Sequence, residues 1–219
     1  MIHPGVARPR RSSRAGMILA GLALAGLAGA AQAGARPARP VLPDIMALGS
    51  PTAPVTVAEY TSLGCDHCIS WALGVYPAFK AKYIDTGKVR FELHEILGGD
   101  SALAMAGFLT ARCAGEDKYF EVVEKVFHSR EELGRGGIDA MAEIAAGAGL
   151  DRPRFDACFK DAKAQNGMRD RIAKDGIAHN INNIPSFVVN GLAYDMGEMS
   201  LKELDAAIAK AMAAAKGAP

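Results

Sequence analysis

The sequence has no excess of charge of either sign. Its 25 Lys and Arg residues are matched by 24 Asp and Glu residues. Residues 1–33 contain four arginines and no acid, so the rest of the chain carries 21 basic and 24 acidic residues, a net charge of −3. This balance lacks the basic surface that nucleic acids and anionic membranes attract, so we expect neither as a partner.

Cysteine is scarce, and its spacing excludes several kinds of site. Cys65 and Cys68 form a C-x-x-C motif, whereas Cys113 and Cys158 are isolated and stand 45 positions apart. A structural zinc site takes four ligands, which this pattern does not supply. Covalent haem attachment requires a histidine directly after the motif, where Ile69 stands. The sequence therefore predicts neither a metal nor a cofactor, and it shows no internal repeat.

Long hydrophobic runs are absent except near the N-terminus. Four arginines precede a run of small and apolar residues over 15–31, and Ala31–Ala33 (AQA) supplies an A-x-A cleavage pattern. We interpret residues 1–33 as a cleavable signal peptide and predict a periplasmic protein. A membrane anchor is the alternative, but the run is short, rich in Ala and Gly, and has no stop-transfer flank. An exported thiol pair tends to oxidise, so its default state is a disulfide.

The patterns after the signal peptide predict a β-α-β unit. Residues 34–54 are rich in proline and read as an extended lead-in with at most one short strand near 45–48. Residues 55–60 form a predicted strand, in which period two puts Glu59 on the face of Val55 and Val57, so its carboxylate is expected to be buried. A helix with a kink at Pro77 and a second strand, over 89–94, complete the segment 55–99.

A helical segment is predicted over residues 100–178, with Asp151 as an N-cap. Over 179–219 the patterns predict strands at 186–189 and 192–195, joined by an Asn190-Gly191 turn, and a final helix opened by the capping box Ser200–Glu203. The predicted fold is therefore α/β, with an all-helical insertion between the second and third core strands.

The position of the C-x-x-C motif indicates redox chemistry. At the start of a helix, the free backbone N–H groups and the helix dipole favour a thiolate, so Cys65 is the expected nucleophile. Cys68 lies one turn further in, where it is more buried and can reach the first sulfur, and is the expected resolving cysteine. A purely structural disulfide is the alternative, but so short a loop gains little from chain entropy.

A second informative element is Asn183-Ile184-Pro185-Ser186, directly before a predicted strand. A cis bond at Pro185 would expose the backbone of Ile184 for pairing with an extended substrate. An ordinary trans proline at a strand entry is the alternative, and base rates favour it. Only the combination with the C-x-x-C motif makes the cis form the prediction.

Four features of the chain carry a family resemblance: the segments "VTVAEYTSLGCDHC" and "NIPSFVVNG", the helical insertion and the terminal βα unit. Through them the chain resembles the DsbA branch of thioredoxin-fold thiol oxidoreductases over 48–216. The resemblance implies a thioredoxin fold that exchanges disulfides with folding secreted proteins and is reoxidised by a quinone-linked membrane protein. We expect a monomer. It also implies roles for individual residues. The positions that match the family are the nucleophile Cys65, the resolving Cys68, the thiolate-stabilising His67, the cis-proline Pro185 with Ile184 before it, and the proton-transferring Glu59.

The sequence departs from the family at Asp66, where the usual residue is proline. A carboxylate beside Cys65 should destabilise its thiolate, although the helix dipole favours Asp66 itself. We therefore expect a less oxidising centre than DsbA, whose potential is about −120 mV, on the order of −150 to −200 mV. An oxidase is the preferred interpretation. An isomerase or reductase kept reduced by a membrane electron donor, and a non-enzymatic metal or peptide chaperone, remain alternatives.

The remaining cysteines and histidines are expected to be structural. Cys113 and Cys158 lie on apolar helix faces, so a disulfide between them is predicted in an oxidising compartment, with two buried thiols as the alternative. His94, His128 and His179 are predicted to be surface or capping residues.

Overall fold

The structure is a computed structural model that describes residues 45–179, 181–194 and 197–217. The predicted signal peptide, the lead-in up to residue 44 and Asp195 lie outside the described residues. Within the described ranges, no helix has the length and apolar character needed to cross a bilayer.

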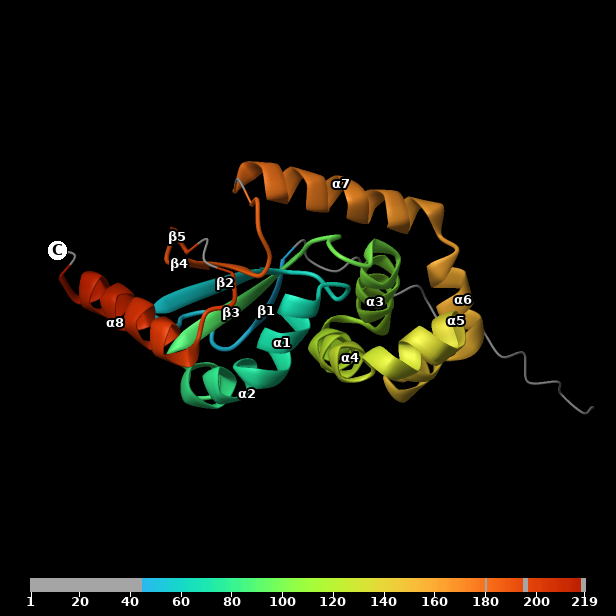
Figure 1. Cartoon of the computed structure of the whole chain (residues 1–219), viewed down its shortest axis with the longest axis horizontal. Coiled ribbons are helices and arrows are strands. Elements are labelled where there is room, and N and C mark those ends of the chain that lie inside the picture. The colour runs from blue at the N-terminus through green and yellow to red at the C-terminus, as the bar shows by residue number, and fades with distance from the viewer. Residues whose placement is uncertain (1–44, 180, 195–196, 218–219) are drawn as a thin grey trace, which may run out of the picture. The chain divides into compact units, whose positions relative to one another are not determined.

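A five-stranded mixed sheet forms the centre of the fold (Figure 1). Its strands lie in the order β1-β3-β2-β4-β5. β2 and β3 pair in parallel, and the other neighbours pair antiparallel. The strands are β1 (Met46–Leu48), β2 (Val55–Thr61), β3 (Val89–Glu95), β4 (Ser186–Val189) and β5 (Leu192–Tyr194). The predicted strands and the predicted α/β architecture with a helical insertion are confirmed.

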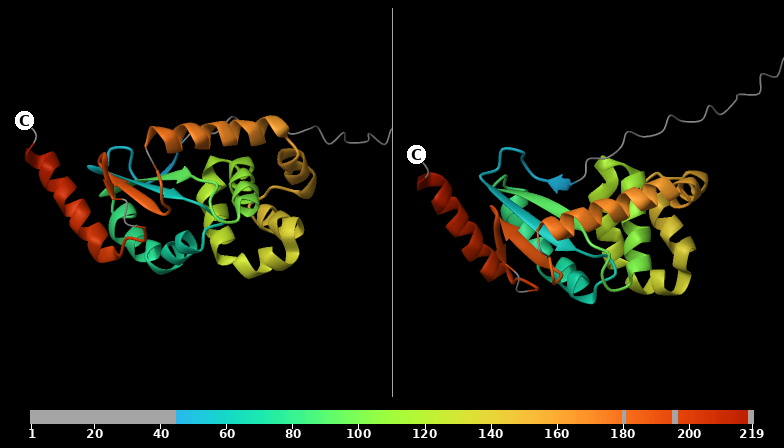
Figure 2. Two further views of the ribbon diagram at one scale, coloured as in Figure 1. Left: turned by 45° about the horizontal axis from the view of Figure 1, so that its top comes forward. Right: turned by 90° about the horizontal axis from the view of Figure 1, so that it is seen from above.

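The two faces of the sheet follow from the register of β2 on β3. Val57 pairs with Phe91 and Glu59 with Leu93, so these four side chains share one face. That face meets α1 (Asp66–Gly74) and α2 (Tyr76–Phe79). The opposite face is covered at its edge by α7 (Ala162–Ala178), which crosses on the side away from α1 and α2 (Figure 2).

The helix after the C-x-x-C motif is broken into three parts rather than kinked once. α1 ends at Gly74, α2 carries Pro77 in its first turn, and a π-helical turn, η1 (Lys80–Ile84), follows. Within α1, Leu73 is 41% exposed, whereas Trp71, two residues earlier, is 1% exposed and lies in the core. The ring of Trp71 contacts those of Tyr76, Phe79 and Phe187. α8 (Leu201–Gly217) contacts α2, β2 and β4, and begins with the predicted Ser200–Glu203 capping box.

The helical insertion lies between β3 and β4 in the chain. It consists of α3 (Ser101–Ala114), α4 (Glu116–His128), α5 (Arg130–Gly147), α6 (Arg152–Phe159) and α7. Side chains of Asp100, Asp151 and Asp161 accept hydrogen bonds from backbone N–H groups at the starts of α3, α6 and α7. These caps mark the starts of three of the helices, whereas α4 and α5 begin without a side-chain cap.

Buried charges tie the end of β3 to the insertion. Glu95 is 4% exposed. Its carboxylate accepts hydrogen bonds from Arg112 of α3 at 2.7 Å, Tyr119 of α4 at 2.9 Å and Arg171 of α7 at 3.0 Å. With three donors from three helices, the buried charge is fully paired, which is the condition under which such a group is tolerated.

The prediction that His94 is a surface residue is wrong. His94 is 5% exposed, packs against the Tyr60 ring at a centroid distance of 4.3 Å, and bonds through Nδ1 to Asp175. Period two assigned it to the polar face of its strand, but α7 covers that face. His128 and His179 are exposed, at the ends of α4 and α7, where the sequence predicts surface or capping residues.

Candidate active site

The C-x-x-C motif lies at the junction of β2 and α1. Cys65 is the N-cap residue of α1, with an extended backbone, and its C=O accepts the first helical hydrogen bond from Ile69 N at 3.0 Å. Its thiol is therefore next to the free N–H groups of the helix start, where a thiolate is favoured. This is the position predicted from the sequence.

Glycines let two loops come together beneath the motif. Gly64 O accepts a hydrogen bond from Asp100 N at 2.9 Å, and a Cβ on Gly64 would lie only 2.1 Å from Asp100 O. The same two loops are joined a second time, where the Ser62 hydroxyl donates a hydrogen bond to Gly98 O at 2.7 Å. The β2–α1 loop is thus fixed against the loop that enters the insertion.

The two cysteines differ in access. The structure holds both as thiols, with Cys65 partly exposed and Cys68 fully buried. Burial raises the pKa of the Cys68 thiol well above its usual range, and the nearby Glu59 adds to the rise, against smaller opposing effects of the Thr61 hydroxyl and the Ser62 backbone. Cys65 is therefore the sulfur that another molecule can reach, and Cys68 is held as a neutral thiol.

Pro185 lies beside the motif, as predicted. The Ile184–Pro185 peptide bond is cis, and Cys65 Sγ lies 3.9 Å from Ile184 O. The segment that enters β4 therefore contacts the reactive sulfur through its backbone. Gly98 also faces this segment, since a Cβ there would lie 2.4 Å from Ile184 Cδ1.

Glu59 is buried on the sheet face behind Cys68. It is 3% exposed, and its Oε1 has no hydrogen-bond partner among the residues that the structure describes. Burial raises its pKa from 4.5 to about 8, against a smaller lowering by the Thr61 hydroxyl. It lines a pocket of about 330 Å³ between α1, α2 and α4, together with Trp71 and Tyr76. Such a carboxyl can take up or release a proton near neutral pH.

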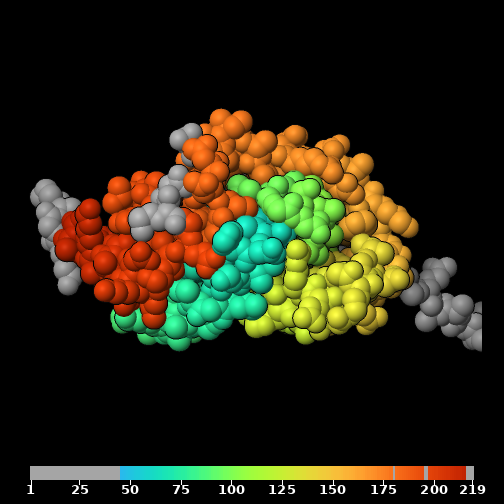
Figure 3. Space-filling model, viewed as in Figure 1, coloured from blue at the N-terminus to red at the C-terminus, as the bar shows by residue number. Residues whose placement is uncertain are grey.

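The two residues between the cysteines are exposed, and each has a partner that the sequence does not reveal. His67 Nδ1 lies 2.8 Å from Glu198 Oε1, and Asp66 Oδ1 lies 3.6 Å from Arg130 Nη2. Figure 3 shows the segment that contains α1 (cyan) between the insertion (yellow) and the start of α8 (red). Glu198 and Arg130 are 131 and 64 positions away from their partners, so no local pattern could identify them.

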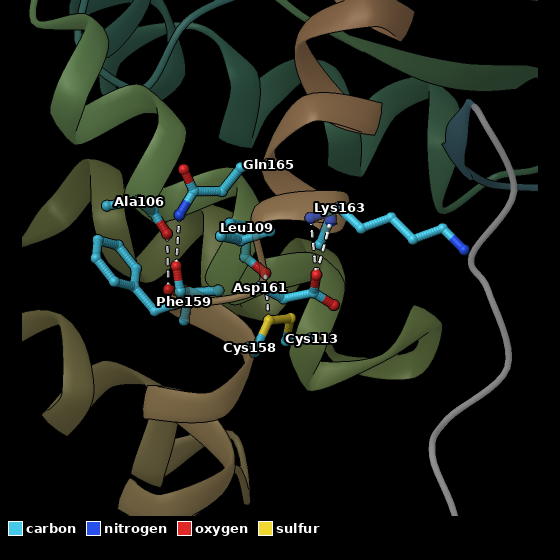
Figure 4. Close-up of a disulfide and its surroundings, with 10 residues drawn as sticks. Ala106, Leu109, Cys113, Cys158, Phe159, Asp161, Lys163 and Gln165 are labelled. Atoms are coloured by element: carbon cyan, nitrogen blue, oxygen red, sulfur yellow. Dashed lines mark hydrogen bonds between the residues drawn. A yellow bond between two sulfur atoms is a disulfide. The ribbon is translucent and has the colours of Figure 1, made fainter.

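Cys113 and Cys158 join two helices of the insertion. The structure places them in a disulfide between α3 and α6, with a Cα–Cα distance of 6.4 Å (Figure 4). Cys158 Sγ also lies 3.9 Å from Leu109 O. The bond links residues within the insertion, so it constrains that part of the chain and not the redox pair.

Comparison with known proteins agrees with this geometry. A family model described as thioredoxin matches residues 42–210. DsbA of Pseudomonas aeruginosa, a thiol:disulfide interchange protein, is 29% identical over 170 residues, which cover 74% of this chain and 78% of DsbA. A Rickettsia bellii protein whose name describes a protein-disulfide oxidoreductase is 25% identical over 174 residues. The chain spans 66% of the length of that relative and 60% of one from Rickettsia conorii.

Among solved structures, α-DsbA1 of Wolbachia pipientis is similar with a TM-score of 0.71 and 25% identity, covering 80% of this chain and 94% of its own. BdbD of Bacillus subtilis shares the fold, with a TM-score of 0.65 at 18% identity. The family model over residues 42–210 shows that the chain belongs to the thioredoxin family, and within it the chain is similar to DsbA-like proteins, with a C-x-x-C pair at the start of α1.

Proposed function

We propose that the chain is an exported oxidase that introduces disulfides into folding secreted proteins. The observation that carries the proposal is the unequal access of the two sulfurs: Cys65 is reachable at the N-terminus of α1, and Cys68 is buried one turn later. The name of the relative DsbA, a thiol:disulfide interchange protein, supports disulfide exchange, and that of a Bacillus cereus relative, a probable disulfide bond formation protein, supports the oxidising direction. The arginines and the AQA pattern of residues 1–33 support export.

In the oxidised state Cys65 and Cys68 form a disulfide. A substrate thiolate attacks Cys65 Sγ, which forms a mixed disulfide and expels the Cys68 sulfur with the bonding electron pair. Cys68 then takes up a proton, which the buried carboxyl of Glu59 can supply because its pKa is about 8. A second substrate thiolate attacks the substrate sulfur of the mixed disulfide and expels Cys65. The substrate loses two electrons, and Cys65 and Cys68 are left reduced.

The reduced pair must be reoxidised before another turnover. A quinone-linked membrane protein would accept the two electrons, as in the DsbA branch that the chain resembles. The extended substrate would pair with the backbone of Ile184, which already contacts Cys65.

Asp66 favours a second candidate, in which the same pair works in the reducing direction. Its carboxylate is 89% exposed and adjoins Cys65 in the chain. A negative charge there disfavours the thiolate and so makes the reduced state less stable. An isomerase or reductase would then take its electrons from a membrane donor.

The reduction potential of the Cys65–Cys68 couple tests the proposal. Residues 34–219 would be equilibrated with glutathione buffers, alkylated, and analysed by peptide mass spectrometry, so that Cys113 and Cys158 are followed separately. A potential well above that of the glutathione couple supports an oxidase. A value near or below about −270 mV, that of thioredoxin, contradicts it and supports the reducing role.

Two variants test the roles of the cysteines. Cys68→Ser, mixed with an unfolded substrate that carries a disulfide, should accumulate mixed disulfides on Cys65, because the Cys65 thiolate attacks that disulfide and no Cys68 thiol is present to resolve the product. Cys65→Ser should accumulate none, since the Cys68 sulfur is buried. Metal content after purification under reducing conditions would separate a metal chaperone from a catalyst.

A further inference from the structure

The dipeptide between the cysteines is held by charges from two different parts of the fold. Arg130 is the first residue of α5 in the insertion, and it approaches Asp66. Glu198 lies between β5 and α8, and it bonds to His67. Each residue of the dipeptide is thus paired with a side chain of opposite formal charge, on opposite sides of the helix start.

The Glu198 contact is anchored at more than one point. Its Oε1 bonds to His67, and its Oε2 accepts a hydrogen bond from the Ser70 hydroxyl at 3.0 Å. The next residue, Met199, is 1% exposed, and its C=O accepts a hydrogen bond from Trp71 Nε1 at 2.9 Å. Side chains of three α1 residues, His67, Ser70 and Trp71, therefore bond to this segment, and two of them hold the Glu198 carboxylate.

The charges around Cys65 affect only one side of the redox equilibrium. The reduced state can carry a Cys65 thiolate, whereas the disulfide is neutral. A positive neighbour stabilises the reduced state and raises the reduction potential, and a negative neighbour lowers it. Arg130 offsets the carboxylate of Asp66, and Glu198 offsets the charge that His67 carries when protonated.

We propose that Glu198 and Arg130 are positioning residues that tune the reduction potential of the Cys65–Cys68 couple in opposite directions, Glu198 through His67 and Arg130 through Asp66. This inference rests on the proposed disulfide exchange and adds the two residues that set its driving force. It also explains how an acid is accommodated next to the nucleophile: Arg130 neutralises it.

The test compares Glu198→Gln and Arg130→Gln with the unchanged protein in the glutathione equilibrium. Because exposed charge pairs contribute about 0.2 to 1 kcal/mol, Glu198→Gln should make the couple about 1.4- to fivefold more oxidising, and Arg130→Gln less oxidising by a similar factor. At about 30 mV per tenfold, the larger factor is about 20 mV. The double variant should return close to the original value. Asp170→Asn and Arg169→Gln, at exposed positions of α7, are matched charge controls.

Two further measurements separate tuning from a structural role. Both shifts should shrink in 1 M salt, where the Debye length falls to about 3 Å. Glu198→Asp, which keeps the charge, should lie nearer the unchanged protein than Glu198→Gln. In a His67→Ala background the Glu198→Gln shift should be smaller, because the part transmitted through the imidazole is lost.

Several results would overturn the inference. Shifts of the same sign for both variants, or shifts no larger than those of the α7 controls, contradict opposite tuning. Equal Glu198→Gln shifts with and without His67 mean that Glu198 acts by its own charge and not by positioning the ring. If the unchanged protein exchanges with glutathione but the variants have the same reduction potential as it does, the tuning is wrong and the proposed function stands. If the unchanged protein does not exchange at all, both are wrong.

Discussion

Glu59 makes the sharpest quantitative prediction, because its burial links stability to pH. Its pKa is 4.5 in an exposed chain and about 8 in the fold, where burial is the main cause. The folded protein therefore holds this proton more tightly than the unfolded chain does. Stability is fully present below about pH 4.5 and falls as the pH rises toward 8, where the carboxyl must ionise in its buried site.

The size of the effect follows from the difference between the two pKa values. At 1.36 kcal/mol per pH unit, the loss of unfolding free energy across this range is about 5 kcal/mol. This is an upper limit, because local relaxation and water entry lower the cost of a buried charge. Carboxyls whose pKa is lowered, such as Asp205 beside Lys82, are ionised in both states above about pH 5 and do not oppose the trend.

Glu59→Gln removes the titrating group and keeps its shape. Unfolding free energies would be measured in urea from pH 5 to pH 9, in a Cys65→Ala/Cys68→Ala background that fixes the redox state and leaves Cys113 and Cys158 intact. The stability of the Glu59 protein should fall relative to Glu59→Gln by up to about 4 kcal/mol between pH 5 and pH 9, because part of the loss has already occurred at pH 5. A difference that stays constant over this range would refute the reasoning, because Glu59 would then not be a buried, neutral carboxyl at pH 5.

The remaining predictions concern the framework of the site. Glu95→Ala should destabilise the fold by about 3 to 5 kcal/mol in urea unfolding, because the partly buried side chains of Arg112 and Arg171 lose their contacts with its carboxylate. A loss below about 1 kcal/mol would contradict a network built on the buried Glu95. Cys113→Ala/Cys158→Ala removes a disulfide between residues 45 positions apart and should lower the unfolding free energy by up to about 4 kcal/mol. The potential of the Cys65–Cys68 couple should stay unchanged, so a shifted potential would argue against a purely structural bond. Gly64→Ala should lower the unfolding free energy by about 2 to 4 kcal/mol and slow exchange with glutathione, because its Cβ would meet Asp100 O at 2.1 Å. An unaffected exchange rate would mean that the contact between the two loops is unimportant for the reaction.

Much of the fold could be predicted from the sequence because its local patterns agree with the tertiary structure. The β-branched run of β2, the Asn190-Gly191 turn and the Ser200–Glu203 capping box each encode their own geometry, and each forms where it was predicted. Pro77 marked a disturbance of the helix after the motif, but not the break at Val75 or the exposure of Leu73. Those depend on which residues pack under Trp71.

The sequence by itself determined the chemistry: two cysteines at the start of a helix, an acid on the buried face of the preceding strand, and a proline ahead of the next strand. These features are local, so residue type and spacing are enough to predict them. Only the tertiary structure decided that α7 buries His94, that Glu95 collects donors from three helices, and that Glu198 and Arg130 hold His67 and Asp66. Such contacts join residues from 17 to 131 positions apart, and chain folding alone brings them together.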